Sequence, residues 1–259
     1  MLYEIAKQAD VFFLIFARVF ALVETAPLLS GDGAPQAAKA GFAAFVSATI
    51  FPWVHAAGYP IPASALGYVM LVAGEALIGI ALGFFLTAVF TAFTTAGQFF
   101  SLQMGFGASE VYDPLAQIEI PLMGQFLNLI AMLVFIMNDG FRRLFLMGVW
   151  RSFESIRAVD LVARRELWFD YALRAIGAMF ANALVLAMPI LGVLMMVSVG
   201  MGLLSKAAPQ MNLLTEGFPI AITTAFLLLF SSLPFLVEAF SAIIDAGFAD
   251  MARLIGGGT

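Results

Sequence analysis

The residues best suited to chemistry in this sequence are ionisable side chains inside long apolar stretches. Glu75 lies within the apolar run 69–90, and a charge at such depth is costly enough to be a functional hypothesis by default. A packing role, with Glu75 neutral or paired, is the alternative. Arg18 and Glu24 are six residues apart in the first apolar stretch and so point about 120° away from each other on one helix. We therefore expect each of them to pair with another element.

Two rows of polar side chains could form the surface of a conduit. In the third apolar stretch, hydroxyl and amide groups recur at spacings of four, three, four and three on one helix face: Thr87, Thr91, Thr94, Gln98 and Ser101. They could make hydrogen bonds between helices or face a water-filled conduit. In the last stretch, polar residues recur every seven residues, which drifts about 20° per repeat on a straight helix: Thr224, Ser231, Glu238 and Asp245. This second face could relay protons, contact partner subunits or lie where the helix leaves the bilayer.

The segment from Gln103 to Pro114 cannot continue a regular helix, because it combines glycines, a proline and large apolar side chains. Irregular backbone at membrane depth is tolerated only where protein buries it or water lines it. The segment is therefore either an external loop or the lining of a cavity, in which its bulky side chains would form a deformable plug. The candidate gating residues are Met104, Gly105, Phe106, Gly107, Val111, Tyr112, Asp113 and Pro114.

Metal, thiol and nucleotide chemistry find little support in the sequence. The chain has no cysteine, which excludes disulfides, thiolate metal sites and cysteine nucleophiles. His55 is its one histidine and is typical of an interfacial residue beside Trp53. No P-loop, nucleophile elbow, dinucleotide fingerprint or zinc-protease spacing occurs, and the net charge of −5 gives no basic surface for nucleic acid. We expect no enzyme activity, no cofactor, no metal and no nucleic-acid partner.

The composition is that of a membrane protein. Hydrophobic residues make up 63% of the chain and charged residues 11%, whereas a soluble domain has roughly a quarter of its residues charged. Lipid, partner subunits or both must cover the remaining apolar surface. Glu4, Lys7 and Asp10 in the first ten residues are unlike a cleaved signal peptide, so we expect the first apolar segment to stay.

Long apolar runs without alternating polarity predict an all-α fold in one domain, 1–259. The expected helices lie near 9–29, 40–57, 64–103, 122–138, 167–203 and 217–252. Several prolines fall between them: Pro35, Pro60, Pro62, Pro114, Pro121, Pro209 and Pro219. Pro189 and Pro234 fall inside runs and are expected to kink those helices. Gly79 and Gly83 form a small-xxx-small pair that permits close helix contact.

Arginines concentrate in the connection 139–166, which predicts that this loop lies in the cytoplasm. Six of the twelve basic residues are there: Arg142, Arg143, Arg151, Arg157, Arg164 and Arg165. Simple alternation would then put both termini in the cytoplasm as well. Acidic residues interleave with the arginines, so the segment could instead be an amphipathic interfacial helix.

Several stretches of the chain resemble the FliR family of flagellar biosynthetic proteins across nearly the full length. The resemblance is carried by Ala26 and Pro27 followed by Pro35 and Lys39, by Thr95 to Gly97, by Gln103 to Gly105, and by Asp113 with Pro114. Its strongest part runs from Gly202, Leu203 and Leu204 through Ala208, Pro209, Gln210, Met211 and Asn212 to Gly217, Phe218 and Pro219. The order and spacing of these motifs together are specific to the family.

The resemblance implies a subunit of the flagellar type III export gate in the bacterial inner membrane, within the basal body. FliR assembles there with FliP and FliQ, next to FlhB and FlhA, into a helical ring through which unfolded flagellar proteins pass. It implies a FliP-like part, 1–166, followed by a FliQ-like helical hairpin, 167–259, which turns around the family motif residues Pro209, Gln210, Asn212, Gly217 and Pro219. The segment from Met104 to Pro114 would then help to close the pore.

Two departures from the family pattern affect the expected site. Gln98 stands where an acidic residue is expected, and Ala108 and Val111 stand where large aromatic residues are common.

Two other functions are compatible with some of these sequence features. The injectisome counterpart has the same architecture but serves virulence secretion, and a proton-coupled small-solute transporter could use Glu75, Glu238 and Asp245. Such carriers usually contain internal repeats, and we detect no convincing repeat here.

Overall fold

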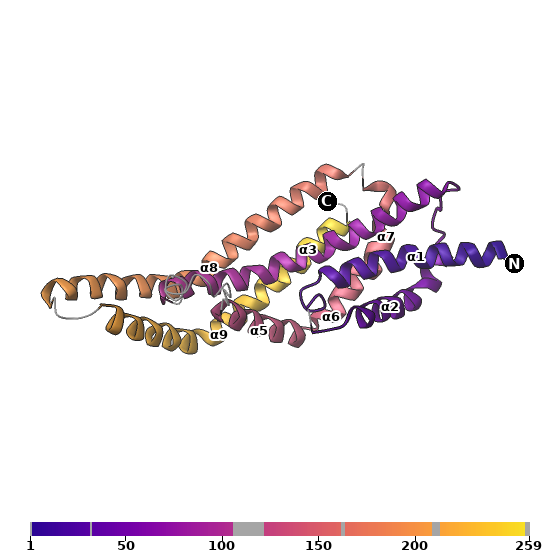
Figure 1. The fold of residues 1–259 in the computed structure, drawn as a ribbon. Helices are drawn as coiled ribbons and strands as arrows, with labels where there is room; N and C mark the ends of the chain where they lie inside the picture. The colour runs from indigo at the N-terminus through magenta and orange to yellow at the C-terminus, as the bar shows by residue number, and fades with distance from the viewer. Residues whose placement is uncertain (1, 32, 106–121, 162–163, 209–212, 257–259) are drawn as a thin grey trace. The chain divides into compact units, whose positions relative to one another are not determined.

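The computed structural model describes residues 2–31, 33–105, 122–161, 164–208 and 213–256, and these residues form helices and no strands (Figure 1). The helices are α1 (Leu2–Thr25), α2 (Gln36–Ala57), α3 (Ala65–Gln103), α5 (Leu122–Met137), α6 (Gly140–Arg143), the π-helix η1 (Leu144–Arg151), α7 (Ser152–Ser155), the 3₁₀ turn η2 (Ala158–Asp160), α8 (Arg165–Ala207) and α9 (Leu213–Gly256). The all-α prediction is confirmed, and each expected apolar run corresponds to one helix.

Glycine and proline set several of the helix ends. Pro35 is the N-cap of α2, where its missing amide costs nothing. Gly58 ends α2 with a φ of 72° and Gly105 follows α3 with a φ of 89°, conformations that side chains with a Cβ rarely adopt. Pro189 and Pro234 lie inside α8 and α9 as expected, and the predicted kinks stay predictions.

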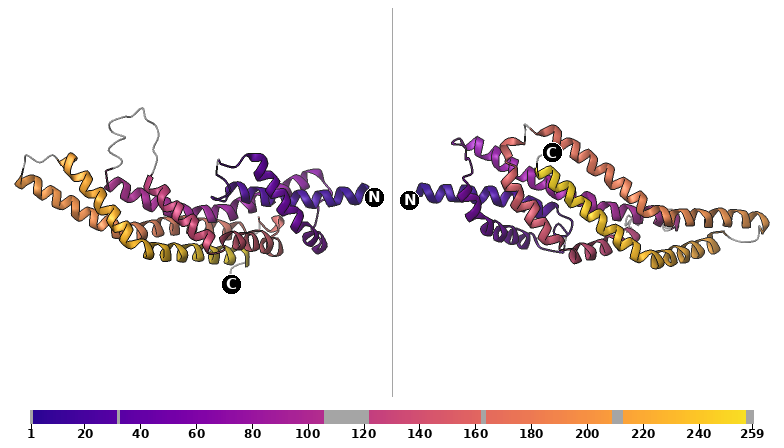
Figure 2. Two further views of the ribbon diagram at one scale, coloured as in Figure 1. Left: turned by 90° about the horizontal axis from the view of Figure 1, so that it is seen from below. Right: turned by 180° about the vertical axis from the view of Figure 1, so that it is seen from behind.

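The chain divides into two compact units, each built from separate stretches of sequence. Unit 1 comprises Met1–Ala88, Asp139–Ala175 and Asp245–Thr259, and unit 2 comprises Val89–Asn138 and Ile176–Ile244. Within unit 1, α1 and α2 lie side by side in both views of Figure 2. The long helices α3, α8 and α9 each contribute residues to both units.

The described part of the connection 139–166 is largely helical rather than a loop, and its cytoplasmic location stays a prediction. α6, η1 and α7 run consecutively from Gly140 to Ser155, and one side of this run is buried in unit 1 through Leu144, Gly148, Val149, Ser152 and Phe153. Arginines on the other side, such as Arg142 and Arg151, are exposed. The amphipathic-helix alternative therefore describes the local structure, because the apolar residues recur with helical spacing between the charges.

The prediction that Pro219 lies between helices is also wrong, since Pro219 and Gly217 both lie inside α9. Proline is tolerated in membrane helices because neighbouring groups can satisfy the backbone that it leaves unpaired. α8 ends at Ala207 and α9 begins at Leu213.

Glycines allow helices to pack backbone to backbone in both units. In unit 1, a Cβ on Gly79 would overlap the carbonyl oxygen of Arg18, and one on Gly83 would lie 2.7 Å from the Cβ of Thr25. The predicted small-xxx-small contact is therefore real, and it joins α3 to α1. In unit 2, Gly97 of α3 packs against Gly124 of α5, where an added Cβ would lie 2.5 Å from the Cα of Gly124.

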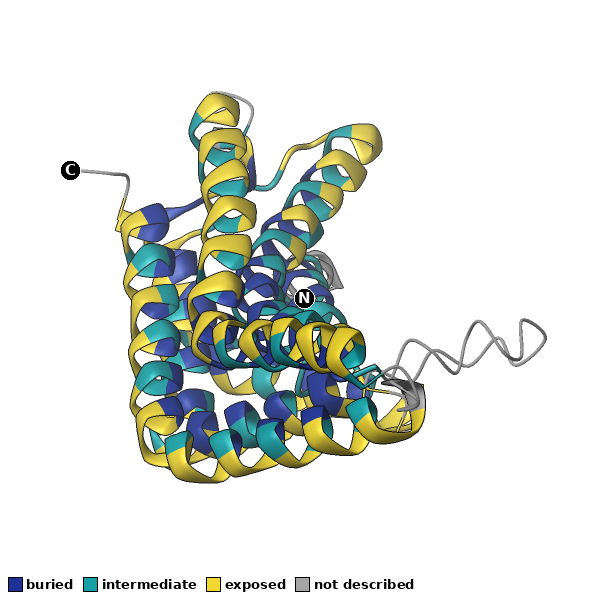
Figure 3. Ribbon diagram, turned by 90° about the vertical axis from the view of Figure 1, so that its left-hand side faces the viewer, coloured by how far each residue is buried: buried dark blue, intermediate teal, exposed yellow. Residues whose placement is uncertain are grey.

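Much of the helix surface remains apolar and exposed. Figure 3 shows exposed residues along one side of individual helices and buried residues along the other. The exposed apolar side chains include Phe180, Met196, Leu203, Phe230 and Phe235 of α8 and α9. By length and composition, four helices in the described residues could cross a membrane, α2, α3, α8 and α9, or up to five if α5 and the run 140–155 form one broken span.

Candidate functional site

A buried ion pair lies at the centre of the polar contacts of unit 1. Arg18 comes from α1 and Glu75 from α3, and their side chains are 1% and 0% exposed. The Arg18 Nε atom donates a hydrogen bond to Glu75 Oε2 over 2.6 Å. The close approach at Gly79, one turn along α3 from Glu75, brings the two helices near enough for this contact.

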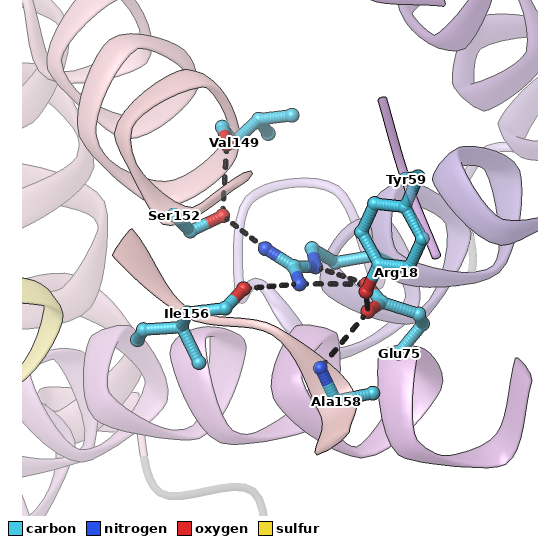
Figure 4. Close-up of polar contacts among 7 residues, drawn as sticks. All are labelled: Arg18, Tyr59, Glu75, Val149, Ser152, Ile156 and Ala158. Atoms are coloured by element: carbon cyan, nitrogen blue, oxygen red, sulfur yellow. Dashed lines mark hydrogen bonds and ion pairs between the residues drawn. The ribbon is translucent and has the colours of Figure 1, made fainter. Parts of the chain in front are cut away.

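Arg18 also binds the segment that follows η1. Its NH1 group donates to Ser152 Oγ and its NH2 group to the carbonyl oxygen of Ile156, each over 2.9 Å (Figure 4). The guanidinium carbon lies 3.9 Å from the centre of the Phe153 ring, a cation–π contact. Ser152 in turn donates to the carbonyl oxygen of Val149 over 2.8 Å. The guanidinium thus holds three elements together through planar, directional bonds.

The second oxygen of Glu75 is also occupied. Glu75 Oε1 accepts a hydrogen bond from the Tyr59 hydroxyl and one of 3.2 Å from the Ala158 amide. Burial, together with the neighbouring Glu75 carboxylate, raises the pKa of the Tyr59 phenol well above its ordinary value of 10.0. Tyr59 and Ala158 lie between the long apolar helices, where hydropathy gives no prediction of contacts. The sequence analysis therefore missed both residues.

This cluster of Arg18, Glu75, Tyr59 and Ser152, the buried polar cluster, can do structural work without further partners. Buried charges are tolerated when they are paired and hydrogen-bonded, and both conditions hold here. The geometry supports the packing alternative for Glu75. The expectation that Arg18 and Glu24 pair with other elements is confirmed, because Glu24 lies 3.6 Å from Lys39 of α2. Lys39 also donates to the Ser30 carbonyl oxygen over 2.9 Å.

The side chains in the polar row of α3 differ in their burial and in their hydrogen-bond partners. Thr87 donates to the backbone carbonyl of Thr25 in α1 over 2.7 Å, which is the interhelical hydrogen bond expected of membrane helices. Ser101 is buried and donates to the Gly97 carbonyl within its own helix over 2.8 Å. Gln98 is exposed, whereas Thr91 and Thr94 are half-buried. The conduit interpretation thus stays a prediction for Gln98 above all.

On α9, Asp245 of the polar row and Ser241, which joins the same face, make polar contacts with other parts of the chain. In unit 2, Asn138 donates to Ser241 Oγ over 2.7 Å. In unit 1, Asp245 forms an ion pair with Arg143, whose guanidinium also lies 5.4 Å from the Phe248 ring centre. Glu238, three residues before Ser241, is exposed. A proton relay along this row stays a prediction.

The stem of the candidate gating loop lies in unit 2. Met104 is fully buried, and Gly105 packs so closely against the Phe218 ring of α9 that an added Cβ would overlap it. Gln103 donates to Ser198 Oγ of α8 over 3.2 Å. The remaining candidate residues lie outside the described residues: Phe106, Gly107, Val111, Tyr112, Asp113 and Pro114. The stem is thus anchored by both long C-terminal helices.

The family motif turn is described only in part. Pro209, Gln210 and Asn212 lie outside the described residues, between the end of α8 and the start of α9. Gly217 and Pro219 lie in the first turns of α9, next to Phe218. The motif therefore includes the helix start that packs against Gly105.

No group of three or more potential metal-binding side chains is found in the described parts of the chain. Of the acidic residues that the sequence analysis singled out, Glu75 lies in α3, whereas Glu238 and Asp245 lie seven residues apart in α9. Glu75 and Asp245 each have a basic partner. Glu75 and Asp245 thus contribute ion pairs between different segments of the chain.

Comparison with known proteins gives a consistent result. The chain is 29% identical to the flagellar biosynthetic protein FliR of Escherichia coli (strain K12) over 246 residues, which cover 95% of this chain and 93% of that protein. It is 29% identical to FliR of Pectobacterium carotovorum subsp. carotovorum over 250 residues, with 94% and 93% covered. FliR of Bacillus subtilis (strain 168) is 30% identical over 221 residues, with 84% of each chain covered.

A family model described as bacterial export proteins, family 1, matches residues 9–247. The match covers the helices of the described chain except the first two turns of α1 and the last turns of α9. This chain therefore belongs to family 1 of the bacterial export proteins.

Proposed function

We propose that this chain is the FliR-type subunit of the flagellar type III protein export apparatus, a multi-pass protein of the bacterial inner membrane. It forms part of the wall of a gated conduit for unfolded flagellar proteins and catalyses no reaction itself. The observation that carries the proposal is the family match over residues 9–247 together with similarity to FliR proteins over nearly the whole chain. Four span-length helices among the described residues support the multi-pass membrane location.

The exposed apolar surface supports a role within an assembly. Side chains such as Phe230, 84% exposed, and Met196, 76% exposed, lie on α9 and α8. Large apolar patches of this kind indicate contact with lipid or with other proteins. FliP and FliQ are the proposed ring partners, with FlhB and FlhA next to them, and the last two long helices are the proposed FliQ-like hairpin, 167–259, after a FliP-like part, 1–166.

The gating role rests on the stem of the loop. Gln103 contacts α8, Gly105 contacts α9 and Met104 is fully buried, so the chain is held in place up to Gly105. A loop fixed at its stem and rich in bulky side chains can close a conduit reversibly. Deletion of residues 105–113 should make the assembled gate leak ions in a conductance assay. Unchanged export and unchanged ion tightness would show that the loop is not the gate.

Co-purification tests the proposed assembly. The tagged chain, expressed with FliP and FliQ of the same organism, should be recovered with both in one detergent-stable complex, visible by imaging as a helical ring. The control is a tagged membrane protein of similar length, which should recover neither. If the chain is recovered alone and monodisperse, the proposed assembly is wrong.

A further inference from the structure

A pocket of about 300 Å³ lies in unit 1, beside the buried polar cluster. The C-terminal end of α2 and the residues after it form one side, and α7 and the chain after it form the other. Its lining includes three aromatic residues, Trp53, Tyr59 and Phe153, and two residues of opposite charge, Glu154 and Arg157. We call it the α2–α7 pocket. Ligand pockets in proteins span about 300–1,000 Å³, so this one suits a small polar group.

The two charged residues of the α2–α7 pocket have no ion-pair partner among the described residues. Glu154 and Arg157 are three residues apart and both exposed, yet neither belongs to an ion pair there. α7 ends at Ser155, and the next two residues are extended, with φ −129° and ψ 120° at Ile156 and φ −107° and ψ 147° at Arg157. The two side chains therefore do not share a helix face. The pocket presents a carboxylate and a guanidinium separately, and each attracts an ion of the opposite charge.

The backbone on both sides of Arg157 is held by the buried polar cluster. The Ile156 carbonyl oxygen accepts a hydrogen bond from Arg18, and the Ala158 amide donates one to Glu75 (Figure 4). Successive side chains of an extended chain point to opposite sides, and here Ile156 and Ala158 are buried whereas Arg157 is exposed. The cluster that joins α1 to α3 thus also directs the Arg157 side chain away from the core.

The aromatic side of the α2–α7 pocket is also fixed in place. The Trp53 ring stacks on Trp150 of the π-helix η1, with centroids 4.6 Å apart and an interplanar angle of 22°. The Tyr59 hydroxyl donates a hydrogen bond to Glu75. π-helical turns are rare and often lie at functional sites. Side chains held in this way lose little conformational freedom when a ligand binds.

The position of the pocket along α2 indicates the surface of a membrane. α2 is one of the described helices that are long and apolar enough to cross a bilayer. Trp53 lies in the last two turns of α2, and Tyr59 follows the end of the helix. Tryptophan and tyrosine concentrate at the depth of the lipid headgroups. With α2 across the membrane, the α2–α7 pocket lies at that depth.

A ligand that satisfies both charges of the pocket carries an anion and a cation close together. A phosphate matches the planar fork of a guanidinium, and an ammonium group matches a carboxylate beside aromatic rings. We propose that the α2–α7 pocket binds the headgroup of a zwitterionic phospholipid, with Arg157 on the phosphate and Glu154 on the ammonium group. Free phosphoethanolamine has the same chemistry without the acyl chains. The inference goes beyond the proposed function, because it assigns a ligand to unit 1 whether or not the chain assembles with FliP and FliQ.

Native mass spectrometry of the full-length chain in detergent, with any subunits that co-purify, tests this chemistry. The probes are phosphatidylethanolamine, phosphatidylglycerol with the same acyl chains, and soluble phosphoethanolamine. Phosphatidylethanolamine should bind about tenfold more tightly than phosphatidylglycerol, which offers Glu154 no ammonium group. Equal affinities for the two lipids would overturn the proposal. Soluble phosphoethanolamine should bind more weakly than its lipid, and equally tight binding would refute the lipid as the source of the headgroup.

Charge-removing variants separate the pocket from the other arginines of the segment. Arg157→Gln should weaken phosphatidylethanolamine binding about tenfold, and Glu154→Gln should abolish the preference for phosphatidylethanolamine over phosphatidylglycerol. Arg151→Gln is the matched control, because Arg151 is exposed on η1 and does not line the pocket. Its lipid affinities should equal those of the wild type. No loss in Arg157→Gln, or an equal loss in Arg151→Gln, would contradict the assigned role of Arg157.

Photo-cross-linking locates the ligand without removing a charge. Because the chain has no cysteine, Ala57→Cys in the pocket and Ala48→Cys on α2 outside it each place a single exposed thiol for a benzophenone maleimide. In vesicles with equal parts of phosphatidylethanolamine and phosphatidylglycerol, Ala57→Cys should give mainly phosphatidylethanolamine adducts. Ala48→Cys should give adducts in proportion to the bilayer composition. The same adduct composition at both positions would refute a selective headgroup site.

Discussion

Arg18 and Glu75, 57 residues apart in the sequence, form an ion pair that is almost completely excluded from solvent. The pair joins α1 to α3, and through Ser152, Ile156 and Ala158 it also fixes the chain that follows η1. A buried pair of this kind is weak evidence for stability by itself, because desolvation opposes the attraction. Its partners nevertheless specify how three distant stretches of unit 1 meet.

Removal of one partner should destabilise unit 1 more than removal of both. Glu75→Leu leaves the Arg18 charge buried and unpaired, which we expect to cost about 3–5 kcal/mol of unfolding free energy. The double variant Arg18→Met with Glu75→Leu should recover most of that loss. Denaturant unfolding followed by tryptophan fluorescence measures both, since Trp53 and Trp150 stack 4.6 Å apart in the same unit. Additive losses in the double variant would show that the two side chains are not coupled.

The contact between α1 and α3 at Gly79 should tolerate no side chain. In Gly79→Ala, the added Cβ meets the Arg18 carbonyl, so the helices must separate, at an expected cost of about 1–3 kcal/mol. Gly41→Ala in α2 is the control, because its Cβ would have no neighbour within 4 Å. That control should be neutral or stabilising by up to about 1 kcal/mol, since alanine favours helix. Thermal unfolding in detergent compares them, and equal midpoints would contradict the close contact.

The Tyr59 phenol should make stability depend on pH only in the alkaline range. Its pKa is raised in the folded chain above the ordinary 10.0, so above pH 10 the unfolded chain loses a proton that the folded chain keeps. The contribution of Tyr59 is therefore complete below pH 10 and declines as the pH rises further. Unfolding midpoints of the wild type and Tyr59→Phe should converge with rising pH above 10. Parallel curves would mean that Tyr59 titrates normally.

The loop stem should be sensitive to the conformation of Gly105. Gly105→Ala puts a Cβ where the φ is 89° and where the Phe218 ring lies, so residue 105 or the Phe218 ring must move. We expect the assembled gate to conduct ions in its resting state. Gly192→Ala in α8, where a Cβ would have no neighbour within 4 Å, should leave conductance unchanged. Conductance that rises equally in both variants would argue against a specific role of the stem.

The helices could be predicted from the sequence because long apolar runs have one stable arrangement in lipid or against other helices. The run 140–155 was expected as a helix only as an alternative, because Arg142, Arg143 and Arg151 interrupt its hydropathy, although Leu144, Val149 and Phe153 are on its buried side. Hydropathy averages over both faces of a helix, whereas burial depends on one.

The partners of the charged residues were only half predictable. The geometry of one helix showed that Arg18 and Glu24 could not pair with each other, but the choice of Glu75 and Lys39 depends on which helices become neighbours. Tyr59 and Ser152 gave no signal, because single polar residues next to helix ends are common in any sequence. Gly79 and Gly83 did give a correct signal, since their spacing alone limits which helix face can approach another backbone.

The most direct test of the central claim is complementation of motility. The chain, expressed in a non-motile strain that lacks its own FliR together with the matching FliP and FliQ, should restore flagellar filaments and swimming. The same chain without residues 105–113 should be inserted in the membrane but should not restore regulated export. If the chain instead restores needle secretion in an injectisome mutant and leaves the flagellar mutant non-motile, it does not serve the flagellar apparatus.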